Sequence, residues 1–175
     1  NGIIENFATL RQELEAEGHE FSTETDTEVV PRLIHHYLDS GLAPVEAAAS
    51  ALKRLEGAFA LGIVFAGEHE LLVGARRGSP LAVGHGDGES FLASDAFAMA
   101  PLTRRISYLE EGDWVVLGPG TVNFFDAEDR PVERAESQTA YDGSVTSKGD
   151  YRHFMAKEIH EQPRVIGDTL NTYYN

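Results

Sequence analysis

The sequence predicts an α+β protein with mainly antiparallel sheets, because helical patterns fill its first third and short strand patterns follow. Before Gly57 the apolar residues recur every three or four positions, which is the helical period. After Gly57 they form short runs separated by glycine, aspartate or proline. Connections this short favour antiparallel pairing, since parallel crossovers need about a dozen residues or more.

Three helical segments are expected before Gly57. The first begins near Ile3 and ends near Gly18, where a glycine can adopt the left-handed conformation that closes a helix. The second is expected over 27–40, and the third over 44–57, because proline suits the first turn of a helix. The apolar stripe of the first helix consists of Ile4, Phe7, Leu10 and Leu14.

The strands are expected where β-branched and aromatic residues are concentrated. They span residues 59–65, 70–75, 81–84, 90–93, 106–109, 113–117 and 121–125. The glycine-rich stretch 84–88 is predicted to be a β-turn, because it lacks the following helix and the lysine of a phosphate-binding loop.

The C-terminal part of the sequence has a different character. Residues 135–150 are small and polar, which predicts a linker or a long loop. A helix is expected to follow, with Tyr151, Met155 and Ile159 spaced four apart until Pro163 interrupts it. We expect the packing partner of this helix to lie outside the chain.

The composition disfavours several classes of protein. The formal net charge is −15 over 175 residues, which argues against nucleic acid and anionic membranes as partners, since both require a basic surface. No apolar run approaches the roughly 18 residues needed to cross a bilayer, and we expect a cytoplasmic protein. Cysteine is absent from the chain, so it holds no disulfide, no thiolate metal site and no cysteine nucleophile.

Histidine is the other residue type that could indicate a metal site. His35 and His36 are adjacent, so on a helix they point about 100° apart and cannot both bind one ion. His153 and His160 share a helical face, but no carboxylate stands at the offset that zinc enzymes use. We therefore expect neither a metal site nor a cofactor.

The acidic run S-T-E-T-D-T-E, residues 22–28, allows two interpretations. One is the start of a helix, in which Thr25 or Asp26 caps the first turn and Glu28 completes a capping box. The other is a carboxylate in a cleft that binds a substrate ammonium group. Spacing alone favours the capping interpretation.

Several segments, taken in order, resemble one known family. They are N-G-I-I-E-N, S-T-E-T-D-T-E-V, R-R-G-S-P-L, A-S-D, L-E-E-G-D and Y-R-H-F-M-A-K-E-I-H-E-Q-P. Together they are similar to the later part of the glutaminase domain in the glutamine–fructose-6-phosphate aminotransferase family. The last of these segments is more specific to that family than the others, and the resemblance covers all but the final residues 172–175.

The resemblance implies a fold and a domain division. The family's glutaminase is an N-terminal-nucleophile hydrolase with four αββα layers, so this chain is expected to form part of that class II glutamine amidotransferase fold. Residues 1–142 would be the later portion of the glutaminase domain. Residues 143–175 would be the linker and the first helix leading to a sugar-isomerase domain.

The resemblance also implies an activity and its residues. In the family a cysteine attacks the side-chain amide of glutamine, and the released ammonia is used to make glucosamine 6-phosphate from fructose 6-phosphate. Asn1 and Gly2 match the oxyanion hole, and Asp26 matches the carboxylate that binds the glutamine α-amino group. Glutamine is thus an expected partner, fructose 6-phosphate is expected through the isomerase domain, and the parent protein is expected to be a homo-oligomer.

The departures from the family pattern limit this expectation. The nucleophilic cysteine, the segment that binds the glutamine carboxylate, and the histidine ahead of Asn-Gly have no counterpart here. The chain alone is therefore expected to be inactive. Two alternatives stay open: a non-catalytic binding module, or the glutaminase part of a related amidotransferase such as the one that uses phosphoribosyl pyrophosphate.

Overall fold

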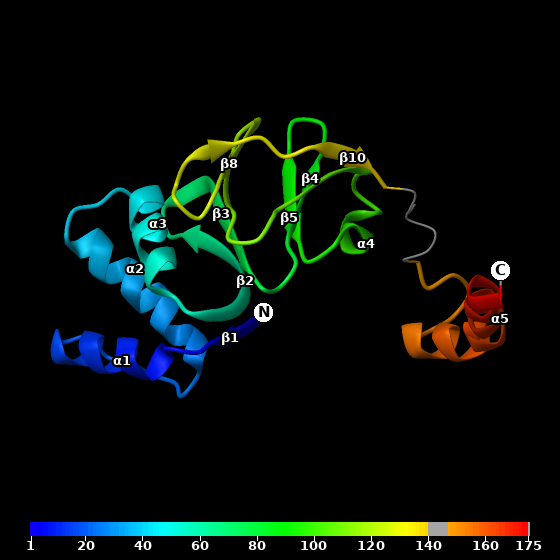
Figure 1. Ribbon diagram of the computed structural model, residues 1–175, viewed down its shortest axis with the longest axis horizontal. Helices are drawn as coiled ribbons and strands as arrows, with labels where there is room; N and C mark the ends of the chain where they lie inside the picture. The colour runs from blue at the N-terminus through cyan, green and yellow to red at the C-terminus, as the bar shows by residue number, and fades with distance from the viewer. Residues whose placement is uncertain (140–146, 175) are drawn as a thin grey trace.

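The computed structural model describes residues 1–139 and 147–174, and its layers confirm the predicted αββα arrangement (Figure 1). Three helices cover a six-stranded sheet, a four-stranded sheet packs behind it, and a short helix covers the outer face of the second sheet. The strand pairs in both sheets are antiparallel.

The helical layer packs on the six-stranded sheet through a large apolar core that includes Leu33, Leu55 and Val73. Its elements are α1 (Phe7–Ala16), the 3₁₀ turn η1 (Asp26–Glu28), α2 (Val29–Asp39) and α3 (Pro44–Arg54). These bounds confirm the helices expected over 27–40 and 44–57 to within a few residues. Pro44 occupies the first turn of α3. A backbone N–H there has no partner within the helix, so proline costs no helical hydrogen bond.

The six-stranded sheet combines the N-terminal strand with strands from residues 57–132. Its order is β1 (Gly2–Ile4), β2 (Gly57–Phe65), β3 (Glu68–Arg77), β7 (Trp114–Gly118), β8 (Thr121–Phe125) and β9 (Pro131–Val132). Gly62 of β2 pairs with Gly74 of β3, and the Leu92 side chain of the second sheet lies against both. A Cβ on Gly74 would stand 2.9 Å from Leu92, so these glycines let the two sheets approach closely.

The four-stranded sheet and its covering helix complete the layers. Its order is β10 (Glu136–Gln138), β6 (Arg105–Tyr108), β4 (Ala82–His85) and β5 (Ser90–Ala93), and the helix is α4 (Ala96–Met99). Residues 86–89 connect β4 and β5 through a bond from the Gly86 N–H to the Glu89 carbonyl. The turn predicted over 84–88 is thus present but begins later, because Gly84 and His85 belong to β4.

Two predictions near strands were wrong for the same physical reason. Ile3 and Ile4 belong to β1 rather than to the first helix, because they pair with Ala58 and Gly57 far along the chain. Likewise, the supposed linker 135–150 contains β10, which pairs with β6. Both strands depend on non-local backbone bonds, which local periodicity does not report.

The helix predicted to stop at Pro163 instead continues, and this prediction was wrong. The helix α5 spans Phe154–Tyr174 with Pro163 inside it, and in Figure 1 it lies apart from the layers. Proline removes one helical bond, but the apolar spacing continues beyond it through Ile166 and Leu170, both of which are exposed. The predicted domain boundary between residues 142 and 143 lies outside the described residues. No helix of the described part combines the length and apolarity that a membrane span requires.

Candidate functional site

The main chain of Asn1 is fixed by two hydrogen bonds to β2. Its nitrogen donates to the Ala60 carbonyl at 3.0 Å, and its carbonyl accepts from the Ala60 N–H at 2.8 Å. Asn1 itself is exposed. The strand therefore holds the backbone of Asn1 in place without using its side-chain amide.

Gly2 can only be glycine in this position. It has a φ of 105°, and a Cβ added to it would lie 2.0 Å from the Ala58 carbonyl oxygen. The peptide between Asn1 and Gly2 is trans and its carbonyl points at β2. Since the two polar groups of a planar trans peptide point in opposite directions, the Gly2 N–H is directed away from β2.

Asp26 lies on the side of β1 that faces away from β2. Its Oδ2 accepts a hydrogen bond from the Ile4 N–H at 2.7 Å, and its Oδ1 accepts a weaker one from the Thr27 hydroxyl at 3.3 Å. Because strand groups alternate with a period of two, the N–H groups of Ile4 and Gly2 open on the same side. The structure thus brings Asn1, Gly2 and Asp26, the three residues predicted for the site, to one edge of the sheet.

The capping role predicted for Thr25, Asp26 and Glu28 was wrong. Thr25 precedes η1 without a side-chain cap, and Asp26 bonds to β1 instead. Glu28 accepts bonds from the N–H groups of Ser22 and Thr23 at 2.9 and 2.7 Å, and from their hydroxyls at 3.1 and 2.6 Å. The Glu28 carboxylate thus bonds to the loop before η1 rather than to the first turn of the helix, because four donors of that loop point toward it.

These bonds also determine the charge of Glu28. The Thr23 hydroxyl, and after it the Ser22 N–H, lower the pKa of Glu28 from 4.5 to about 2, since both stabilise the ionised carboxylate. The guanidinium of Arg32, which lies one helical turn further along the chain, is 3.3 Å from the Glu28 carboxylate. Glu28 is therefore ionised at neutral pH and holds the loop that leads to Asp26.

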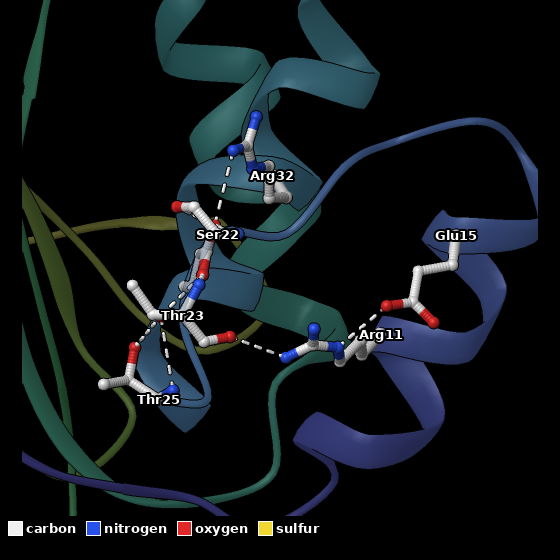
Figure 2. Close-up of polar contacts among 7 residues, drawn as sticks. Arg11, Glu15, Ser22, Thr23, Thr25 and Arg32 are labelled. Atoms are coloured by element: carbon white, nitrogen blue, oxygen red, sulfur yellow. Dashed lines mark hydrogen bonds and ion pairs between the residues drawn. The ribbon is translucent and has the colours of Figure 1, made fainter.

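Arg11 fixes the other side of this loop to α1 (Figure 2). Its Nε donates to Glu15 at 2.9 Å, and one terminal nitrogen donates to the Thr23 carbonyl at 2.8 Å. The guanidinium also lies over the Phe21 ring, 4.7 Å from its centroid. Arg11 and Glu28 together hold the segment before Asp26. Neither role was predicted from the sequence, because the Arg11 bond joins α1 to a separate loop and Glu28 was expected to complete a capping box instead.

The assembled site offers two chemically distinct groups on one strand edge. The Gly2 N–H is a hydrogen-bond donor without net charge, and Asp26 is a carboxylate. Gly2 and Ile4, whose N–H bonds to Asp26, are two residues apart on β1 and therefore separated by roughly 6.6 Å. Such a pair can bind an oxygen at one end of a ligand and a cation at the other.

The chain is similar to known proteins in sequence and in fold. The model of the glutamine amidotransferase domain family matches residues 1–102. A glutamine–fructose-6-phosphate aminotransferase (isomerizing) from Mesorhizobium japonicum is 59% identical over 99% of this chain, and one from Brucella abortus is 56% identical over the same share. The chain spans 28% of the length of each of these relatives.

A solved structure supports the fold. The glutamine phosphoribosylpyrophosphate amidotransferase from B. subtilis, complexed with ADP and GMP, superposes with a TM-score of 0.60 at 25% identity. The similarity covers 72% of this chain and 28% of that one. Because the family model matches more than half of the 175 residues, the chain belongs to the glutamine amidotransferase domain family.

Proposed function

We propose that this chain is part of the glutamine-hydrolysing domain of a glutamine–fructose-6-phosphate aminotransferase. The observation that carries the proposal is the edge of β1, where Gly2 and Asp26 present a donor and a carboxylate on one side. Glutamine has a matching pair of groups, namely a side-chain amide carbonyl and an α-ammonium group.

In this proposal the three residues have separate roles. The Asn1 side-chain amide and the Gly2 N–H donate hydrogen bonds to the oxyanion that forms when a nucleophile attacks the glutamine amide carbon. Asp26 accepts a charge-assisted bond from the substrate ammonium. Since this chain has no cysteine, the thiolate that attacks must come from a part of the parent protein outside these 175 residues.

The parent protein would use the ammonia in a second domain. Loss of ammonia from the tetrahedral intermediate leaves a thioester, which water hydrolyses to glutamate. The ammonia would then aminate fructose 6-phosphate in an isomerase domain that follows α5. We further propose a cytoplasmic homo-oligomer that binds neither nucleic acid nor membranes, in line with the net charge of −15.

The first test concerns Asp26. In the full-length protein, Asp26→Asn should raise the KM for glutamine about tenfold to a hundredfold, because a hydrogen bond to a charged group contributes about 1.5–3 kcal/mol. The kcat should change little, since the ammonium is bound equally in the ground state and the transition state. Steady-state glutaminase kinetics measure both constants.

Asp26→Asn removes the negative charge of the side chain and keeps its size. An asparagine oxygen can still accept from the Ile4 N–H, so the local structure should persist. Asp39→Asn on the exposed end of α2 is the matched control and should leave the KM unchanged. If Asp26→Asn left the KM at the wild-type value, Asp26 would not bind the substrate ammonium.

A further inference from the structure

We propose that Glu17, His19 and His36 form a binding site for a divalent transition-metal ion, with Zn²⁺ as the best match. Each residue offers one ligand atom, and these atoms lie within 4.8 Å of one another. The cluster uses none of the three residues of the glutamine site. The spacing of histidines in the sequence did not indicate this cluster, because His19 and His36 come from different elements.

The backbone that carries Glu17 and His19 is fixed by the end of α1. The His19 N–H bonds to the Leu14 carbonyl at 2.9 Å, and the Gly18 N–H bonds to the Glu15 carbonyl at 3.1 Å. Gly18 has a φ of 95°. This is the Schellman arrangement of a helix C-terminus, and it places Glu17 and His19 on either side of a rigid glycine.

The third ligand comes from the last turn of α2. The His36 Nδ1 lies 2.9 Å from the Glu17 carboxylate, and the His36 ring is 5.8 Å from the His19 ring between centroids. The C-terminal ends of α1 and α2 therefore meet at the cluster. Helix C-termini carry partial negative charge, which favours a bound cation there.

The ligand set indicates which metals fit. Two imidazole nitrogens and one carboxylate oxygen suit Zn²⁺, whereas Mg²⁺ and Ca²⁺ prefer oxygen ligands throughout. Zinc bonds of about 2.1 Å in tetrahedral geometry place two ligand atoms about 3.4 Å apart. The three ligand atoms lie within 4.8 Å of one another, so binding would require the side chains to turn inward by about an ångström. Three protein ligands leave the fourth tetrahedral position to water.

His35 provides an internal control for the proposal. It is adjacent to His36, and its ring lies 6.1 Å from the His19 ring between centroids. Its side chain is exposed, however, and its Nδ1 lies 3.2 Å from the Asp39 carboxylate, one turn further along α2. Its side chain does not belong to the cluster. A bound ion would instead link α2 to His19, at the start of the loop that leads to Asp26.

The test is a titration of the chelator-treated full-length protein with Zn²⁺ by isothermal calorimetry. One ion should bind per chain, and His19→Ala or His36→Ala should weaken binding at least about tenfold. Glu17→Gln should also weaken it, whereas His35→Ala should leave the affinity within about twofold. Far-UV circular dichroism checks that each variant is folded, which is expected because the three side chains are at or near the surface.

Two results would overturn the proposal. One is the absence of Zn²⁺ binding by the folded wild-type protein. The other is a loss of affinity in His35→Ala as large as that in His36→Ala, which would indicate nonspecific binding to surface histidines. The readout is metal binding rather than activity, so its outcome is independent of the proposed glutamine site.

Discussion

Replacing Asn1 with alanine in the full-length protein should lower the kcat for glutamine hydrolysis about 10²- to 10³-fold. This is the usual effect of removing one oxyanion-hole donor, whose bond strengthens as negative charge develops on the carbonyl oxygen. The KM should change far less, because the neutral amide of bound glutamine gains little from the same donor.

The structure allows this loss to be separated from unfolding. Both hydrogen bonds that fix Asn1 to Ala60 use main-chain atoms, so alanine at this position preserves them. Asn123 is exposed on β8, with three strands between it and β1, and Asn123→Ala should keep full activity. A wild-type kcat for the stably folded Asn1→Ala variant would exclude the proposed role of Asn1.

The second large effect should come from a buried ion pair where the chain passes from one sheet to the other. Asp113 is only 1% exposed, and its two oxygens accept bonds from Arg134 at 2.6 and 2.8 Å. The same pair raises the pKa of Arg134, chiefly through its hydrogen bonds to Asp113. Arg134→Ala would leave this buried carboxylate without a cationic partner, with the bond from the Glu110 N–H still in place. It should lower the free energy of unfolding by about 3 kcal/mol or more.

Arg105→Ala is the matched control for Arg134→Ala. Arg105 also makes two bonds to a carboxylate, Glu136, at 2.7 and 2.8 Å, but both side chains are well exposed. Water can solvate either group after the other is removed, so its loss should cost far less. Urea unfolding measures both variants, and equal destabilisation would show that burial of Asp113 is not the cause.

The sequence predicted those parts of the fold that local patterns determine. The helices α2 and α3 and the strand β8 appear close to the expected residues, because their apolar spacing matches their burial. The strand β5 also has the expected bounds, which the turn residues on either side of it indicate. The strands β1 and β10 were missed, since each is defined by a distant partner rather than by its own side chains. Helix α5 is longer than predicted. The prediction ended it at Pro163, although the apolar stripe continues beyond that residue.

Local sequence patterns likewise predicted only part of the site. Spacing alone favoured a capping role for residues 22–28, and only the resemblance to a known family indicated Asn1, Gly2 and Asp26. The structure adds the bond from Ile4 to Asp26, which explains how residues so far apart in the chain meet. It also adds Glu28 and Arg11 as the residues that hold the intervening loop. Bonds between a side chain and a loop backbone leave no periodic signal in the sequence.

We propose that this chain holds groups that bind glutamine and its oxyanion but supplies no nucleophile. The decisive measurement is ammonia release from glutamine, compared side by side for the purified 175-residue chain and the full-length protein. We expect release by the full-length protein, and none above the protein-free background from the chain, which contains no cysteine. Sustained glutamine hydrolysis by the pure chain would show that it contains a nucleophile of its own.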